Sequence, residues 1–407
     1  MSEAVIVSTA RSPIGRAFKG SLRELRADDL TVAVVTAALA KIPGLDPRLV
    51  EDLYLGCAEP SGEQGANLAR VVAVLAGYDH LPGATINRFC SSSVQTTRMA
   101  FHAIKAGEGD VFISGGVECV SRYSDWEGAG GSKTSTHSPK FADTQARSAQ
   151  MIRDNATWTD PRGEGLLPDV YIGMGQTAEN VATLRGISRA RQDEWGVISQ
   201  NRTEKAIADG FYARDITPVT TPDGTVVAAD DSPRAGVTLE SISGLPSVFR
   251  ETGTVTAGNC CPLSDGAAAI VVMSDTRARE LGLTPLARVV STGVTALSPE
   301  IMGMGPVEAS RMALARAGMS IKDMDLVEMN EAFAVQVLAS VDDLGIDTDK
   351  LNVHGGAIAL GHPFGATGAR ITTTLLNGLA TRDGQFGLET MCVGGGQGMA
   401  IIYERLS

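Results

Sequence analysis

Cys90 is the first residue of this chain whose type and position could support covalent chemistry. It lies between a short apolar run and a helix-like segment that opens with three serines, Ser91 to Ser93. Unpaired N–H groups and the positive dipole end of a helix stabilise a thiolate and lower the pKa of a cysteine. The position therefore predicts a nucleophile with a lowered pKa, although a free cysteine is also commonly a small buried core residue.

Two of the five histidines lie in the stretch NVHGGAIALGHPFGATGAR. His362 stands on a turn enforced by Pro363 and the glycines, just before a helix that begins near Thr367. A histidine held on such a turn suits a general base, but it could also only hydrogen-bond the turn. His354 has no evident partner and is predicted to be structural. The stretch lacks the GK[ST] ending of a phosphate-binding loop.

Cys392 opens the sequence MCVGGGQG directly after a β-rich run. The three glycines leave backbone amides accessible beside Cys392, which suits an acid/base group next to an oxyanion hole. A cysteine that only packs in the core is an equal alternative. Asn330 and Glu331 in MNEAFA also suit a helix N-cap and a first-turn acid. His354, His362 and Cys392 lack the compact ligand spacing of a zinc site, so no metal is predicted.

Composition limits the classes of function. The chain has 407 residues with 43% hydrophobic and 20% charged residues, which is typical of a soluble globular protein. A net charge of −12 and a pI near 5.0 argue against nucleic-acid binding. No apolar stretch is long enough to span a membrane, and the N-terminus does not resemble a signal peptide. The six cysteines form no CxxC pairs, which favours a reducing, cytoplasmic setting.

The chain alternates strand-like and helix-like segments up to about residue 120, which predicts a mostly parallel sheet with helices on both faces. The polar stretch from Ser121 to Tyr171 then predicts a lid or an inserted subdomain. A sheet-like pattern resumes near Thr252, and its segments resemble those of the first half, which indicates an internal duplication. The expected elements are strands at 4–9, 50–56, 84–89, 111–114, 267–274, 286–293 and 324–330, and helices at 27–41, 63–75, 92–106, 177–185, 188–208 and 306–317.

Four motifs occur in one order: NRFCSSS, NEAFA, GGAIALGHPFGATGAR and CVGGGQG. Together with TAEN, GTVTAGN and SDGAAA they make the chain resemble the thiolase family nearly from end to end. The resemblance implies an α/β thiolase fold, in which two duplicated βαβαβαββ halves form a five-layered αβαβα core. It places the first half at 1–120 and 251–278, an inserted loop domain at 121–250, and the second half at 279–407.

The resemblance also implies the roles of five residues. Cys90 would be the acylated nucleophile, His362 its base, and Cys392 the second acid/base. Asn330 would hold a water that forms one oxyanion hole with His362, and the N–H groups of Cys90 and Gly394 would form the other. No permanently bound cofactor is implied, and coenzyme A would be a co-substrate.

Further residues match positions that line the coenzyme A and acyl site of the family, namely Arg234, Ser241, Met174, Phe249, Cys261, Phe333 and Met302. Two positions depart from the family pattern. Gly173 stands where members specialised for acetoacetyl-CoA have a histidine, and Cys261 replaces a serine. The first departure favours the degradative type with broader acyl chains.

The expected function is therefore thiolytic cleavage of 3-oxoacyl-CoA, as in β-oxidation. The alternatives are an acetoacetyl-CoA thiolase and, from another class, a non-catalytic acyl-CoA-binding protein on the same fold. The resemblance further implies a homodimer or homotetramer, and some relatives are subunits of a β-oxidation complex.

Overall fold

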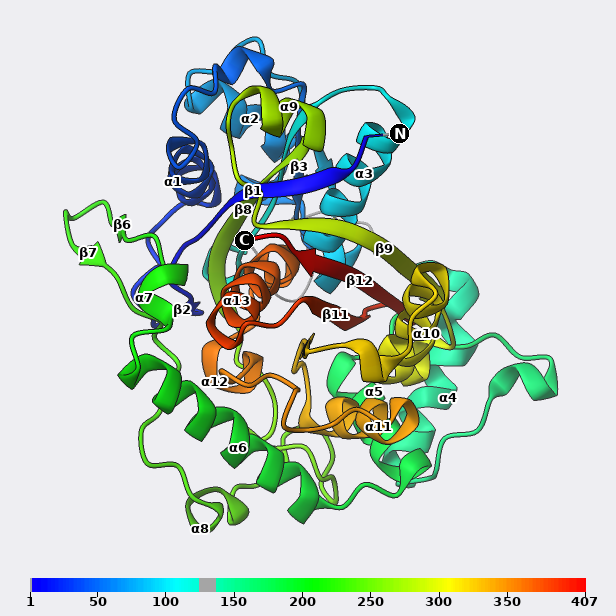
Figure 1. Cartoon of the computed structure of the whole chain (residues 1–407). Helices are drawn as coiled ribbons and strands as arrows, with labels where there is room; N and C mark the ends of the chain where they lie inside the picture. Colours follow the sequence, from blue (N-terminus) through cyan, green and yellow to red (C-terminus); the bar gives the residue numbers. More distant parts are fainter. Residues whose placement is uncertain (1, 124–136) are drawn as a thin grey trace.

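The computed structural model of the chain describes residues 2–123 and 137–407. Its centre is a ten-stranded mixed sheet in the order β10-β11-β12-β9-β1-β8-β5-β3-β4, with β2 paired to β8 (Figure 1). The strands are β1 (Ala4–Arg11), β2 (Gly15–Arg16), β3 (Asp52–Gly56), β4 (Gly83–Ile86), β5 (Val111–Cys119), β8 (Ser264–Ser274), β9 (Ala287–Ala296), β10 (Leu326–Met329), β11 (Phe386–Val393) and β12 (Gln397–Arg405).

The prediction of a mostly parallel sheet is right for the segment up to about residue 120, where β1, β3, β4 and β5 run in one direction, but the sheet as a whole is mixed. In the described chain, parallel pairing joins only β3 to β4, β3 to β5 and β10 to β11. β8 runs antiparallel to both β1 and β5, and β12 runs antiparallel to both β9 and β11. The three-residue turn Gly394–Gly396 between β11 and β12 can only reverse the chain direction, whereas a parallel pair needs a long crossover.

The internal duplication is visible in the strand order. β1-β8-β5-β3 in the first half corresponds to β9-β12-β11-β10 in the second, so the two halves mirror each other. β1 and β9 meet through only two residue pairs, Val5 with Arg288 and Ile6 with Ala287. The sheet is therefore two similar sheets joined at a narrow seam, which agrees with the thiolase fold.

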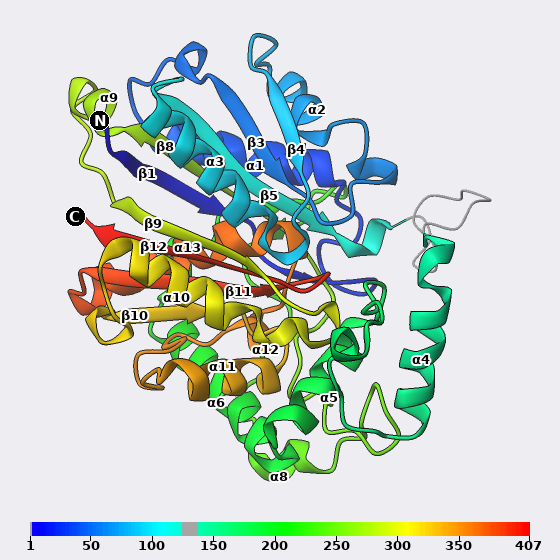
Figure 2. The same ribbon diagram turned by 90° about the vertical axis from the view of Figure 1, so that its right-hand side faces the viewer.

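The two sheets form two layers of the fold, and helices form the other three. α3 and α13 lie between the two halves and share one apolar core with strands from both (Figure 2). α1 and α2 cover the outer face of the first half, and α10 and α11 that of the second. The helices outside the insertion are α1 (Ala27–Ala40), α2 (Leu68–Leu75), α3 (Ser92–Ala106), α9 (Asp275–Glu280), α10 (Gly305–Ala317), α11 (Ala334–Leu344), α12 (Ala357–Leu360) and α13 (Thr367–Arg382).

The central helix α13 is buried on almost all sides, although its sequence is rich in threonine. The hydroxyls of Thr372 and Thr373 donate to the carbonyls of Gly368 and Ala369, four residues earlier. Bonds of this kind satisfy buried hydroxyl groups within the helix itself. The helix can therefore occupy the middle layer without leaving polar groups unpaired at these positions.

The insertion adds helices but, within its described part, no strand to the large sheet. It contains α4 (Ala142–Arg153), α5 (Met174–Arg185), α6 (Arg189–Ala208), α7 (Tyr212–Asp215) and α8 (Leu239–Ser243), and the separate strand pair β6 (Val219–Thr220) and β7 (Val226–Val227). Residues 124–136 of the predicted lid lie outside the described residues. Figure 1 shows α6 and α8 beside the second half. The exact division into three domains stays a prediction.

Most expected elements are present within a few residues, but one helix begins late and one strand ends early. The helix expected at 63–75 begins only at Leu68, and the strand expected at 84–89 ends at Ile86, because the chain turns sharply at Phe89. None of the helices in the described ranges is both long and apolar enough to cross a membrane.

Candidate active site

Cys90 lies on a single 3-10 turn, Phe89–Ser91, between β4 and α3. Phe89 has a φ of 45°, in the left-handed region that a bulky residue rarely adopts. The turn is held because the Asn87 side chain accepts the Phe89 N–H at 2.8 Å and the Ser92 hydroxyl donates to the Phe89 carbonyl at 2.7 Å. Strained backbone of this kind persists only where its surroundings enforce it, and it is concentrated at functional sites.

The expectation that the helix start lowers the pKa of Cys90 is wrong. Burial raises the pKa of this thiol to about 11, and the negative charge of Glu118 adds to the effect. Hydrogen bonds from the N–H groups of Gly394 and of Cys90 itself lower the pKa but do not offset burial. Cys90 is therefore a thiol at neutral pH, and it needs a base before it can act as a nucleophile.

His362 is held in one tautomer by its neighbour Thr367. Its Nδ1 lies 2.6 Å from the Thr367 hydroxyl, which donates its own hydrogen to the Pro363 carbonyl at 2.8 Å. The hydroxyl can therefore only accept from His362, so Nδ1 carries the proton and the lone pair is on Nε2, where it accepts a hydrogen bond from the Asn330 amide. Burial, helped by the charge of Arg370, lowers the pKa of His362 to about 3. The imidazole is thus neutral and able to accept a proton.

The backbone around His362 explains the glycines of this stretch. Gly361 has a φ of 108°, and a Cβ there would lie 2.5 Å from the Ser264 hydroxyl, which accepts the His362 N–H. A Cβ at Gly365 would lie 2.5 Å from the Val117 carbonyl oxygen. Only glycine lets this turn fit against β5 and β8.

Asn330 directly follows strand β10 and lies next to His362. Its Nδ2 lies 3.2 Å from His362 Nε2, while its Oδ1 is buried and accepts no hydrogen bond from the described residues. The N-cap alternative for Asn330 and Glu331 is wrong, because α11 begins at Ala334 with Phe333 as its N-cap. Glu331 instead accepts hydrogen bonds from α6 and α12, including one from Ser199 at 2.6 Å.

Cys392 is fully buried near the end of β11, close to the turn that contains Gly394. Burial raises the pKa of its thiol well above the ordinary value, and the charge of Cys90 raises it further, so the two sulfurs are neighbours. A Cβ on Gly394 would lie 3.3 Å from the Phe89 ring. The glycine turn of the second half therefore packs directly on the cysteine turn of the first.

Polar contacts also join these two turns. Arg88, just before the cysteine turn, donates to Gln397 at 2.7 Å and to Gln95 at 3.0 Å.

Glu118, at the end of β5, accepts the N–H groups of Gly365 and Ala58, each at 2.8 Å. The same buried carboxylate accepts from the side chains of Gln64 and Tyr123. Glu118 therefore ties the histidine turn to the wall of the cysteine site.

Replacing Glu118 with glutamine is expected to destabilise the fold by about 1–3 kcal/mol, because the new NH₂ group would face N–H donors. The pKa of Cys90 should fall, since the charge that raises it is removed. Thermal unfolding and the pH dependence of iodoacetamide alkylation of Cys90 measure the two effects. Glu59→Gln is the control, because the Glu59 side chain has no such role. An unchanged alkylation profile in Glu118→Gln would contradict the electrostatic part.

A cavity of about 290 Å³ opens at Cys90. Its walls include Phe89, Val170, Tyr171, Met174 and Phe364. Of the predicted coenzyme A residues, only Met174 lines it. The cavity is therefore placed to receive a group attached to the Cys90 sulfur.

A smaller cavity of about 50 Å³ contains the predicted residue Arg234 together with Arg16. The same cavity is lined by Gly258 and Pro262, which stand shortly before and directly after the two adjacent cysteines in the sequence, and by Ile358 of α12. Two arginines in a cavity that is also lined by Gln200 and Ser232 suit an anionic ligand group. Arg16 was missed by sequence reasoning, because nothing in the local pattern RSPIGRAF marks it.

The other predicted ligand residues line neither of these two cavities. Phe249 packs edge-on against Phe333 with ring centroids 6.0 Å apart, and Met302 is buried in the same apolar cluster. Ser241 forms the capping box of α8 with Thr238. The thiol of Cys261 has its pKa raised by burial and then by the charges of Cys260, Cys90 and Cys392, so Cys261 lies near these three cysteines.

His354 packs against the segment around α7. Its ring stacks on Phe211 with centroids 3.7 Å apart, and its carbonyl accepts the Tyr212 hydroxyl at 2.6 Å. Burial lowers its pKa to about 4, with the charges of Arg382 and Arg214 contributing. These contacts agree with the structural role predicted for it.

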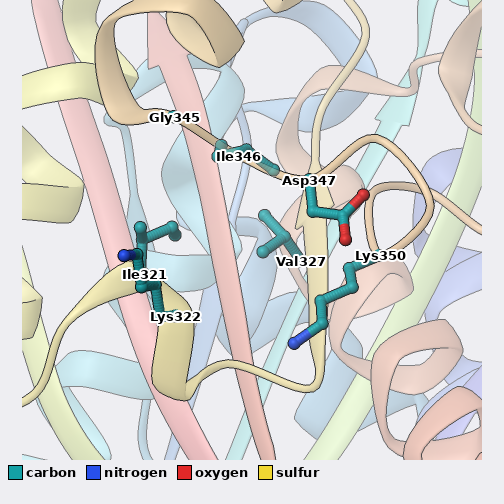
Figure 3. Close-up of a pocket in the computed structure, with 7 residues that line it drawn as sticks. All are labelled: Ile321, Lys322, Val327, Gly345, Ile346, Asp347 and Lys350. Carbon is teal, nitrogen blue, oxygen red and sulfur yellow. The ribbon is translucent and has the colours of Figure 1, made fainter.

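A third cavity, of about 150 Å³, lies beside the edge strand β10 (Figure 3). Lys350 donates its ammonium to the Met324 carbonyl at 2.9 Å, and Asp347 points away from it. The cavity wall contains no cysteine or histidine, so it offers no nucleophile. Within the described ranges, no three His, Cys, Asp or Glu side chains are grouped as metal ligands.

Comparison with known proteins gives matches along nearly the whole chain. The family model described as "Thiolase, N-terminal domain" matches residues 4–276, and "Thiolase, C-terminal domain" matches residues 283–405. The chain is 42% identical to the 3-oxoadipyl-CoA/3-oxo-5,6-dehydrosuberyl-CoA thiolase of Escherichia coli and 42% identical to the 3-ketoacyl-CoA thiolase of Aeromonas salmonicida, over the full length of each pair.

Two solved structures share the fold. The acetyl-CoA acetyltransferase of Bacillus anthracis superimposes with a TM-score of 0.86 at 37% identity, and human mitochondrial 3-ketoacyl-CoA thiolase with 0.85 at 35%. Each comparison covers 100% of this chain, with 99% of the first structure and 99% of the second. With both domain models matched and full-length relatives this similar, the chain belongs to the thiolase family.

Proposed function

We propose that this protein is an acyltransferase that cleaves 3-oxoacyl-CoA with coenzyme A, producing acetyl-CoA and a shortened acyl-CoA. The observation that carries the proposal is that Cys90 lies near Cys392 and that the turn following His362 lines the cavity at Cys90 through Phe364. Cys90 and Cys392 are neighbours, and His362 has its lone pair at Nε2. Carbon–carbon cleavage next to a thioester needs a soft nucleophile, a base and a second acid.

The first half-reaction begins with transfer of the Cys90 proton to Nε2 of His362. The thiolate adds to the 3-oxo carbon, and the bond between C2 and C3 then breaks. Its electron pair stays on C2 as the enolate of acetyl-CoA, which takes a proton from the Cys392 thiol. The shortened acyl group remains on Cys90 as a thioester.

Two groups of hydrogen-bond donors support this step. The N–H groups of Cys90 and Gly394 already point at the Cys90 sulfur, so they are placed to bind the oxygen of an acyl group attached there. Asn330 beside His362 is placed, with a water on its open Oδ1, to stabilise the enolate oxygen.

The second half-reaction releases the product. Cys392, now a thiolate, takes the proton of an incoming coenzyme A thiol, whose sulfur attacks the acyl group on Cys90. The bond from the acyl carbon to Cys90 breaks, and the Cys90 sulfur recovers its proton from His362. The enzyme returns to its starting state without a bound cofactor, with coenzyme A only a co-substrate.

The nucleotide end of coenzyme A is assigned to the cavity that contains Arg16 and Arg234, because its phosphates need cationic partners. Ser241, Phe249, Phe333, Met302 and Cys261 remain proposed contacts along the pantetheine arm. We also propose a homodimer or homotetramer in the cytoplasm, as the family resemblance implies. Light scattering after gel filtration measures the oligomeric state.

The test is thiolysis of a 3-oxoacyl-CoA series from four to twelve carbons, followed by the loss of the 3-oxo thioester absorbance. We expect turnover of six carbons and longer. Turnover of the four-carbon substrate alone would assign the acetoacetyl-CoA alternative. Binding of all substrates without an acyl adduct on Cys90 by mass spectrometry would instead favour the non-catalytic acyl-CoA-binding alternative.

A further inference from the structure

The insertion supplies one wall of the cavity at Cys90. Four of its residues line the cavity: Val170, Tyr171, Ile172 and Met174. Asp169, directly before them, is buried, and its carboxylate accepts the Tyr171 N–H at 3.0 Å. An aspartate that bonds the backbone two residues ahead fixes the turn between them. The position of Asp169 therefore sets the position of this wall.

Glu300 holds Asp169 from the second half of the molecule. It lies on the 3-10 helix η7 (Pro299–Met304), and its side chain is only 3% exposed. One carboxylate oxygen accepts the Asp169 N–H at 2.8 Å and the Arg147 guanidinium at 2.9 Å, and the other accepts the indole N–H of Trp158 at 2.7 Å. Hydrogen bonds to an ionised acceptor are stronger than those between neutral groups. This one carboxylate therefore fixes three separate points of the insertion.

The chain around Glu300 is itself anchored to the glycine turn of the site. The Leu297 N–H donates to the Gly396 carbonyl at 2.8 Å, and a Cβ on Gly396 would lie 2.4 Å from the Leu297 carbonyl oxygen. The side chain of Asn180, on α5, donates to the Glu300 carbonyl at 2.8 Å. Glu300 thus connects the turn that packs beside Cys90 to the inserted wall on the other side of the cavity.

The segment that Glu300 holds contributes little to the apolar core. Among the described residues from 137 to 172, none belongs to the four apolar clusters of the chain. Figure 2 shows α4, which carries Arg147, at the outer edge of the molecule. Segments with few buried apolar contacts open more easily than the rest of a fold. Loss of the Glu300 contacts should therefore displace this segment while the two halves stay packed.

We propose that Glu300 is a positioning residue: through Asp169 it holds the inserted wall at its place opposite Cys90, and it thereby sets the affinity for the acyl part of the substrate. This inference rests on the proposed thiolytic function. It extends that function to a side chain that does not touch the reacting atoms.

Glu300→Gln tests the proposal, because it keeps the size of the side chain but turns an NH₂ group toward at least one of the three donors. The ligands are S-octyl-CoA and S-ethyl-CoA, thioethers that cannot transfer an acyl group, and calorimetry measures their Kd. We expect the Kd of S-octyl-CoA to rise about fourfold or more, the effect of about one lost buried methylene. The Kd of S-ethyl-CoA should stay unchanged. An equal change for both ligands, or no change for either, would overturn the inference.

Trp158→Phe is a second variant that keeps an aromatic ring and removes the N–H bonded to Glu300. It should weaken S-octyl-CoA selectively as well, and the double variant should lose less than the product of the two single effects, because both act through one contact. Glu308→Gln is the matched control, since the Glu308 side chain is 66% exposed on α10. Independent, multiplicative effects of the two variants would show that Glu300 does not act through the insertion.

Kinetics separates positioning from catalysis. In thiolysis of 3-oxooctanoyl-CoA, Glu300→Gln should raise KM and leave kcat nearly unchanged, because the wall contributes equally to substrate and transition-state binding. A fall in kcat at unchanged KM would overturn the inference. Absence of thiolysis by the wild type would count against the proposed function alone, since the Kd comparison needs no carbon–carbon cleavage.

Discussion

Cys90→Ala is expected to lower kcat/KM for thiolysis by about 10⁴-fold or more, because loss of a covalent nucleophile removes the acyl-enzyme route altogether. No other cysteine can replace it. Cys392 is fully buried with a pKa raised well above its ordinary value, and the backbone N–H groups of Cys90 and Gly394 converge on the Cys90 sulfur alone. Steady-state kinetics measures the loss, and intact-mass spectrometry should show an acyl adduct on the wild type that the variant lacks.

The matched control for this variant is Cys119→Ala, which removes a buried thiol of β5 outside the site. It should retain kcat while losing some stability, because a large-to-small change in a core leaves a cavity. If Cys90→Ala keeps wild-type turnover, or if its adduct moves to another residue at the same rate, Cys90 is not the nucleophile.

His362→Gln is expected to lower kcat by about 10²- to 10⁴-fold, the usual contribution of a general base. With the pKa of Cys90 near 11, thiolate is roughly three to four orders of magnitude less abundant than thiol near neutral pH. The role proposed for His362 is to accept this proton. Because a base with a pKa of about 3 is far weaker than the thiolate that it would generate, the transfer requires that the thiolate and the imidazolium stabilise each other as an ion pair. Removing the imidazole should slow both turnover and the alkylation of Cys90 by iodoacetamide.

The lowered pKa of His362 also predicts how kcat changes with pH. Because the pKa of His362 is lowered to about 3, the wild-type imidazole stays unprotonated as the pH falls through 6.5, where an exposed histidine would lose its activity as a base. Wild-type kcat should therefore persist down to pH 5. In His362→Gln the rate should instead rise about tenfold per pH unit, following the thiolate population below pH 11.

His354→Gln is the matched control, because His354 is also a histidine with a pKa lowered by burial, but it stacks on Phe211. It should leave the pH profile of kcat unchanged. A wild-type acid limb near pH 6.5, or an equal effect of the two substitutions, would contradict the role given to His362.

Local features of the fold could be read from the sequence because they depend on neighbouring residues. The apolar face of α1 and the serine-rich start of α3 predict those helices to within a residue or two. The antiparallel placement of β8 could not be read in this way. β8 pairs with both β1 and β5 although the insertion separates it from them in sequence, and no local pattern encodes such a pairing.

For the candidate site, too, some features could be predicted from the sequence and others could not. The sequence by itself determined which residues could react, since the order of the cysteine, asparagine, histidine and glycine motifs is a property of the chain. Thr367 and Glu118 were missed because a threonine in a helix start and a glutamate after a strand are ordinary residues until their partners are known.

Only the tertiary structure decided the chemical state of those residues. A helix start alone predicted a lowered pKa for Cys90, but burial between the two halves raises it, because removing water penalises the thiolate more than two backbone N–H groups stabilise it. The same burial keeps His362 neutral. Desolvation depends on what packs around a residue from distant parts of the chain, so the sequence names the reacting groups and the packing of the two halves sets their protonation.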